Sequence, residues 1–230
     1  MHHRTTFARA GAIAGIAFFV LMAVRVIVSP DIGTPDDPST VVADKVAAHS
    51  QGVLVDAYAG GVATVLLLVF ATGLCSALVR AGAAREPVAL AYAGAVSAFA
   101  LASLSHVLTA ALAYGAPRAS ADAATTQALF DLAKMADTVT WFGLAAFVGS
   151  ASLAALRLRV LSRGAAYGGL AIAAVCLLAA GGMARHGVFA VEGAFQVLAL
   201  LGVVAWVLEA GIRLLRAPRR AALVPAPARV

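Results

Sequence analysis

The chain has 230 residues, of which 62% are hydrophobic and only 12% are charged, and its mean hydropathy is +0.93. Soluble domains average about 45 to 50% apolar and about 25% charged residues, so the composition excludes an ordinary soluble domain and predicts one integral membrane domain. The net charge of +6 does not indicate a nucleic-acid partner, because the basic residues stand at the ends of apolar runs and form no basic face with stacking aromatics. The expected surroundings are a lipid bilayer.

Six apolar segments follow one another along the chain. A helix rises about 1.5 Å per residue and needs roughly 20 apolar residues to cross the bilayer core. We predict an all-α, polytopic membrane protein whose six transmembrane helices occupy residues 10–28, 53–79, 88–114, 138–156, 165–184 and 189–210. These spans make a single domain over residues 1–216, and residues 217–230 form a flexible basic tail.

The first span carries Gly11 and Gly15, a G-x-x-x-G spacing that lets another helix approach closely. The loop that follows, residues 30–52, begins as a coil rich in proline. From residue 39 onward it can form a short helix on the outer surface, with Ser39 or Thr40 as its N-cap. Three valines are expected on one side of this helix, namely Val41, Val42 and Val46.

An amphipathic segment at residues 125–137 leads directly into the fourth span. Its predicted apolar side consists of Leu129, Leu132, Met135 and Val139. This side can lie on the membrane surface or cap the helix bundle. We expect a cap, because the segment continues into a span.

The distribution of basic residues predicts the orientation. With both termini cytoplasmic, 12 of the 17 basic residues lie inside, as the positive-inside rule requires: Arg4, Arg9, Arg80, Arg85, Arg157, Arg159, Arg163, Arg213, Arg216, Arg219, Arg220 and Arg229. Outside stand Lys45, Arg118, Lys134 and Arg185. Trp141 and Tyr114 near the outer boundary, and Tyr167 near the inner one, are typical interfacial anchors.

Placing polar residues by depth gives one candidate site. In this topology five residues fall in the outer third of the membrane: Arg25, Asp56, His106, Asp137 and Gln196. A charge in hydrocarbon costs at least about 2.5 to 3.5 kcal/mol, so such residues snorkel, pair or line a wet cavity. The set is either an interfacial belt or a ligand-binding outer pocket centred on His106, with Asp56 and Asp137 as the expected partners of Arg25.

Other kinds of chemistry lack a sequence signal. His49, Asp56, His106, Asp137 and His186 have no second strong ligand at i+3 or i+4, and neither H-E-x-x-H nor C-x-x-C occurs, so we predict no metal. No G-x-S-x-G, Walker loop or dinucleotide-binding G-x-G-x-x-G motif is found. We therefore assign no catalytic residue and no cofactor.

Three parts of the sequence together resemble a broad group of six-span bacterial integral membrane proteins that carry a domain-of-unknown-function label. They are T-P-D-D-P-S-T-V-V-A-D at residues 34–44, T-T-Q-A-L-F-D-L at residues 125–132 and L-R-L-R-V-L-S-R-G-A-A-Y-G-G-L at residues 156–170. The resemblance implies a helical bundle in the bacterial plasma membrane. It brings no activity or site residues.

Three functions are compatible with these features. The first is a non-enzymatic plasma-membrane protein that acts through helix contacts, with a membrane-protein partner or as a homo-oligomer, or by binding a lipid or small ligand; abundant Ala and Gly favour it. The second is a small secondary transporter or channel that uses the outer Arg, Asp and His residues for a proton or an anionic solute. The third is an outer-facing membrane enzyme, which requires a nucleophile or metal site.

Overall fold

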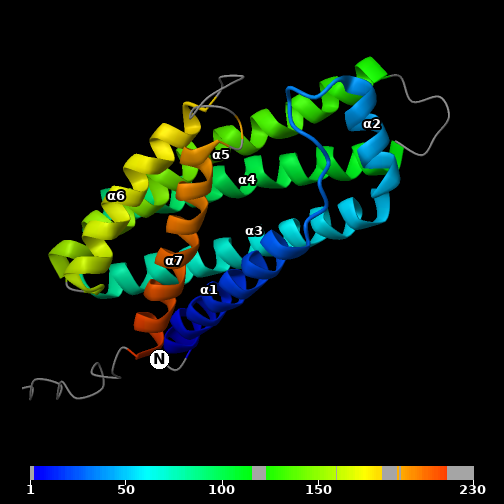
Figure 1. Ribbon diagram of the computed structural model, residues 1–230. Helices are drawn as coiled ribbons and strands as arrows, with labels where there is room; N and C mark the ends of the chain where they lie inside the picture. The colour runs from blue at the N-terminus through cyan, green and yellow to red at the C-terminus, as the bar shows by residue number, and fades with distance from the viewer. Residues whose placement is uncertain (1–2, 116–122, 159, 183–190, 192, 217–230) are drawn as a thin grey trace, which may run out of the picture.

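The computed structural model describes residues 3–115, 123–158, 160–182, 191 and 193–216. These residues form seven helices and no strand (Figure 1): α1 (His3–Val28), α2 (Ser39–Ala48), α3 (Ser50–Arg80), α4 (Arg85–Gly115), α5 (Ala123–Leu158), α6 (Arg163–Ala180) and α7 (Ala194–Arg216). Six of them, all except the short α2, are long and apolar enough to cross a membrane. The predicted all-α fold with six spans is therefore confirmed, whereas the orientation of the termini stays a prediction.

Each of the six long helices differs from its predicted span at one end or both, and two of the differences change the connections between spans. The amphipathic segment and the fourth span are one continuous helix, because α5 begins at Ala123. The fifth span ends at Ala180, four residues before the predicted end, and the sixth begins at Ala194. The link between them, with Arg185, His186 and most of its other residues, lies outside the described residues, as does the predicted tail, residues 217–230.

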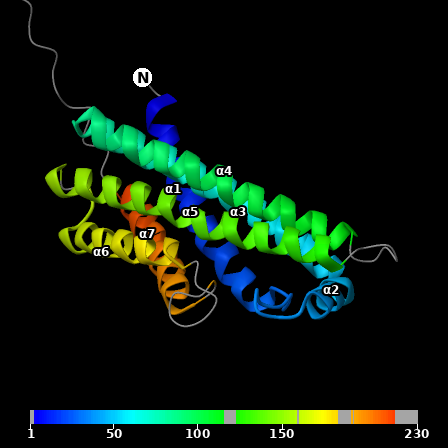
Figure 2. The same ribbon diagram turned by 90° about the horizontal axis from the view of Figure 1, so that it is seen from above.

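The six long helices form a closed ring of neighbours. In order around the ring, α1 packs against α3, α3 against α4, α4 against α5, α5 against α6, α6 against α7, and α7 back against α1. Figures 1 and 2 show α3, α4 and α5 running side by side as the longest members, with α2 at their shared far end. We call that end the α2 end. The opposite end is the arginine-rich end, where Arg80, Arg85, Arg157, Arg163, Arg213 and Arg216 lie.

Glycine allows the closest helix contacts. At the α4–α5 contact, a Cβ atom on Gly94 would lie 2.6 Å from the backbone nitrogen of Phe147, and one on Gly143 would lie 2.7 Å from that of Ala98. The predicted G-x-x-x-G is a contact of the same kind, since a Cβ on Gly11 would lie 2.8 Å from the Cα of Gly73 on α3. Without side chains at these points the helix backbones can meet directly, which is how packing replaces the hydrophobic effect inside a lipid environment.

Three aromatic rings meet at the centre of the ring of helices. Phe70 of α3, Phe147 of α5 and Trp206 of α7 contact one another edge to face, with ring centroids 5.8 to 6.3 Å apart. Both phenylalanines are fully buried and Trp206 nearly so. Edge-to-face pairs add about 0.5 to 1.5 kcal/mol each beyond their buried area, so this aromatic cluster fixes the spacing of three helices that come from different parts of the chain.

A second, smaller core lies at the α2 end. Val42 and Val46 of α2 are fully buried there against Phe130 of α5 and Leu112 of α4. The prediction for Val41 was wrong: it is 38% exposed, because one face of so short a helix packs on the bundle and this residue lies beside that face. The N-cap prediction was also wrong, since the helix begins at Ser39 and its N-cap position is Pro38.

The amphipathic start of α5 packs on α4 and on the short α2, and it does so through other side chains than those predicted. Its buried residues are Thr126, Phe130, Ala133 and Ala136. Of the predicted apolar side, Leu132 is 52% exposed, and Leu129, Met135 and Val139 are only partly buried. The α4–α5 contact is close, so small residues and one aromatic ring occupy it and the longer aliphatic side chains lie at its margin.

Lys45 holds the loop before α2. Its ammonium group binds the carboxylates of Asp31 at 3.0 Å and Asp37 at 3.5 Å. Asp31 also accepts a hydrogen bond from the backbone N–H of Gly33, whose φ of 94° suits glycine. The Gly33 N–H, and after it the Lys45 charge, hold the pKa of Asp31 below its usual value. The loop thus leaves α1 in a defined path beside the candidate site.

Replacing Gly94 with Ala tests the close helix contact. The new methyl group would meet backbone atoms of α5, which cannot rotate away, so Gly94→Ala should lower the stability by about 1 to 3 kcal/mol. Gly168→Ala in α6 is the matched control, because a Cβ there meets no heavy atom within 4 Å. Thermal unfolding of both variants in one detergent measures the effect. Equal unfolding midpoints for the two variants would contradict the role of this contact.

Candidate functional site

Two of the predicted site residues form an ion pair between α1 and α3. Arg25 donates to both carboxylate oxygens of Asp56, through Nε at 2.9 Å and Nη2 at 2.8 Å. Ser29, one helical turn beyond Arg25, donates its hydroxyl to the same carboxylate at 2.7 Å. The side chains of Arg25 and Asp56 are 16% and 20% exposed. The bidentate geometry satisfies each charge with a partner from another helix, which is what a charge at this depth requires.

A cavity of about 280 Å³ opens beside this ion pair. Arg25, Ser29, His106 and Asp137 line its polar part. Its remaining walls are largely apolar and come from five helices; they include Phe18, Met22, Ala63, Leu67, Ala95, Ala98, Phe99, Ala102, Leu144, Leu200 and Val203. Ligand sites commonly combine apolar walls with a few convergent polar groups.

The aromatic cluster lies deeper in the bundle than the cavity lining. Leu67, Leu144 and Val203 line the cavity on α3, α5 and α7, and Phe70, Phe147 and Trp206 follow each of them by three residues. All three helices run from the α2 end toward the arginine-rich end. A step of three residues is about 4.5 Å along a helix, so the buried rings lie almost one turn deeper. None of the three rings lines the cavity.

His106 reaches the cavity because α3 has a glycine opposite it. A Cβ atom on Gly60 would lie 2.3 to 2.7 Å from three atoms of the imidazole ring, so the ring rests directly on the α3 backbone. The charged groups whose fields act on the ring are Arg25 and Asp56. The imidazole thus stands between the ion pair and the apolar wall, where it can exchange a hydrogen bond with a bound molecule.

Trp141 supplies a donor that has no acceptor. The residue is only 7% exposed and lines the cavity, and its indole Nε1 has no hydrogen-bond partner among the described residues. A buried N–H without a partner costs about 1 to 3 kcal/mol. The prediction that Trp141 is an interfacial anchor was wrong, because the ring points into the bundle; Tyr114 and Tyr167 are exposed, as expected for anchors.

The two remaining predicted residues have different surroundings. Asp137 lines the cavity but is exposed, and no described contact joins it to Arg25, whose carboxylate partner is Asp56. Gln196 does not line the cavity. It is buried and donates from Nε2 to the hydroxyl of Thr138 at 3.2 Å, which ties α7 to α5. The structure therefore brings Arg25, Asp56 and His106 together, with Asp137 at the same cavity, and gives Gln196 a place in helix packing.

Several lining residues were not anticipated from the sequence. Ser29, Gly60, Thr140 and Trp141 have no motif around them. Ser29 stands four residues after Arg25, a helical i+4 spacing that indicates a shared face. Gly60 gave no such signal, because its role depends on which helix lies opposite. Among the described residues, no group of three or more His, Cys, Asp and Glu side chains is arranged to hold a metal ion.

Comparison of the chain with models of protein families, with curated proteins and with solved structures found no match. The resemblance to six-span bacterial membrane proteins accordingly stays a prediction. The geometry of the cavity is thus the basis for a functional proposal.

Neutralising Asp56 tests the ion pair. In Asp56→Asn the Arg25 charge stays half-buried without a carboxylate, and breaking one partner of a buried pair costs about 3 to 5 kcal/mol. We expect a lower unfolding midpoint for this variant in detergent. The double variant Arg25→Met, Asp56→Leu removes both charges and should recover most of the loss. If the double variant is as unstable as Asp56→Asn alone, then Asp56 does not stabilise the protein through its ion pair with Arg25.

Proposed function

We propose that the protein is a non-enzymatic, multi-pass protein of the bacterial plasma membrane that binds a small neutral amphiphile in the cavity. The amphiphile would enter the cavity from the outer side. The single observation that carries the proposal is a mostly apolar cavity whose lining includes Trp141, a buried tryptophan with an unpartnered indole N–H. A carbonyl or hydroxyl oxygen of the ligand would accept from Trp141. Its apolar body would lie against the aliphatic walls.

The charges around the cavity favour a neutral head group. Arg25 is the cation closest to a bound molecule, but its charge is neutralised by the bidentate contact with Asp56. Asp137 adds a carboxylate at the same cavity. An anion would therefore meet no uncompensated positive charge from Arg25, and the acceptor that Trp141 requires need not be charged.

The aromatic cluster favours binding over conduction. A transporter or channel that uses Arg25, Asp56, His106 and Asp137 needs a path past the middle of the membrane. Deeper than the cavity lining, Phe70, Phe147 and Trp206 meet between α3, α5 and α7, and large apolar side chains provide no relay for a proton or an anion. The transporter alternative would require this cluster to open.

Ligand binding can be followed through Trp141 itself. The chain has two tryptophans, so Trp206→Phe leaves the indole of Trp141 as the reporter. In this background, decanol should change the Trp141 emission saturably, whereas decanoate and decylammonium, with the same chain length but a charged head, should bind more weakly. Stronger binding of decanoate would contradict the neutral-ligand proposal and favour the anionic solute of the transporter alternative.

A variant that fills the cavity distinguishes decanol bound in the cavity from decanol dissolved in the surrounding detergent or lipid. Ala102 is buried and lines the cavity, so Ala102→Leu should weaken decanol binding by about tenfold or more. Ala100→Leu on the same helix is the matched control, because that residue is exposed. An identical decanol response in the two variants would place the alcohol in the detergent or lipid and would overturn the proposal.

A further inference from the structure

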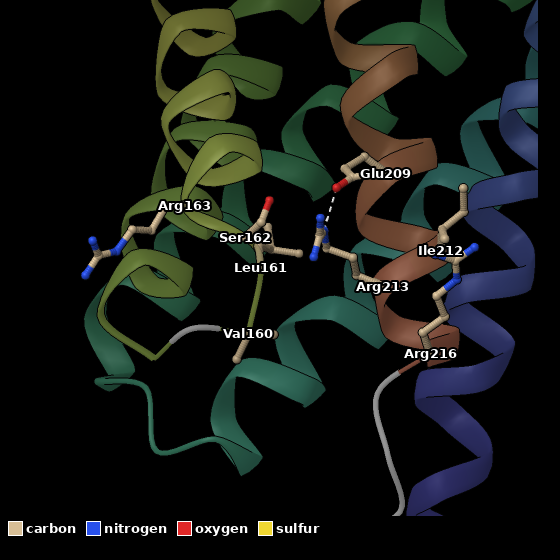
Figure 3. Close-up of a pocket in the computed structure, with 8 residues that line it drawn as sticks. All are labelled: Val160, Leu161, Ser162, Arg163, Glu209, Ile212, Arg213 and Arg216. Atoms are coloured by element: carbon tan, nitrogen blue, oxygen red, sulfur yellow. Dashed lines mark hydrogen bonds and ion pairs between the residues drawn. The ribbon is translucent and has the colours of Figure 1, made fainter.

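A second hollow lies at the arginine-rich end, between the α5–α6 turn and the last turns of α7. Its volume is about 460 Å³. Figure 3 shows Arg213 of α7 in the space between the two helices, where it forms an ion pair with Glu209. Arg163, at the start of α6, and Arg216, at the end of α7, stand at opposite edges of the hollow, and their guanidinium groups point away from Arg213.

The charges of this hollow do not balance. Among the described residues, three arginines and one carboxylate, that of Glu209, line it. Arg213 uses Nε for Glu209, which leaves the positive charges of Arg163 and Arg216 in excess. The first turn of α6 adds to this excess, because a helix N-terminus carries partial positive charge. Ser162 caps that helix by accepting from the N–H of Ala165 at 3.1 Å, and its hydroxyl can also donate to a molecule in the hollow, which it lines.

The hollow also has an apolar side that suits a membrane boundary. Leu161 is buried beneath it, and Val160 and Ile212 are partly buried in its wall. The hollow lies where two membrane-spanning helices end or begin. A molecule there can place an anionic group against the arginines while its uncharged part lies along aliphatic side chains.

We infer that this hollow binds a phosphate-bearing anion, supplied by a phospholipid head group or by free phosphate. Guanidinium groups match phosphate oxygens in fork geometry, and Ser162 can donate a further hydrogen bond. Basic hollows between transmembrane helices are typical positions for anionic lipid head groups. This site is separate from the cavity beside Arg25, so it can be tested whether or not that cavity binds an amphiphile.

The test uses the full-length protein, purified in an uncharged detergent, and native mass spectrometry to count bound lipid. The probes are phosphatidylglycerol, which is anionic, phosphatidylcholine of the same acyl chains, which is zwitterionic, and inorganic phosphate. The double variant Arg163→Gln, Arg216→Gln removes the excess charge and leaves the Arg213–Glu209 ion pair intact. The matched control is Arg85→Gln, Arg157→Gln, which removes two exposed arginines at the same end that do not line the hollow.

For the wild type and the control we expect one phosphatidylglycerol to bind in preference to phosphatidylcholine, and we expect the Arg163→Gln, Arg216→Gln variant to lose about tenfold or more of that affinity. If inorganic phosphate displaces the bound lipid, both probes occupy the same anion site and the site stands. If inorganic phosphate binds with the same dependence on the two arginines and the lipid does not bind, the anion is free phosphate and the site also stands. A variant Arg163→Lys, Arg216→Lys, which keeps the charges, should retain part of the binding and exclude a folding defect. Equal losses in the double variant and its control, or no loss in either, would overturn the inference.

Discussion

Direct contact between helix backbones is the constraint on which this structure depends. Lipid tails are as apolar as the side chains, so helices in a bilayer associate through close packing rather than through burial from water. At Gly94 and Gly143 the missing side chains let α4 and α5 touch. The same preference for small residues leaves space elsewhere in the bundle. The aromatic cluster holds α3, α5 and α7 apart. Alanines such as Ala98 and Ala102 line the cavity beside Arg25 and are too small to fill it. Contact and cavity thus have one cause.

The Arg25–Asp56 ion pair joins the two parts of this arrangement. A buried ion pair is weak evidence for stability, because apolar residues of similar size often serve as well. Its position is more informative. It lies at the polar end of the cavity and connects α1 to α3 where His106 rests on Gly60. The pair compensates the charge of Arg25 without removing the hydrogen-bonding groups around it, so the cavity is polar at one end.

The sequence predicted the parts of the fold that depend on position along one helix. Hydropathy located the six spans, and the depth of Arg25 and Asp56 predicted their pairing. It did not predict which face of α5 is buried or that Trp141 points inward, because both depend on the neighbouring helix and not on periodicity alone. The two faces of α5 are similar in hydropathy in a chain this apolar, so the pattern that separates core from surface in a soluble helix is weak here. Gly60 and the aromatic cluster have the same origin: each requires side chains from helices distant in sequence.

The two ends of the bundle differ in the chemistry they offer. At the α2 end, the one arginine in the cavity is committed to a carboxylate, and the unpartnered group is a neutral donor, the indole of Trp141. In the hollow at the arginine-rich end, the described lining has three arginines and one carboxylate, which pairs with Arg213. The aromatic cluster separates these environments within the membrane, so a molecule held at one end gains nothing from the groups at the other. If both proposed sites bind ligands, their selectivity would follow from whether the arginines of each site are already paired.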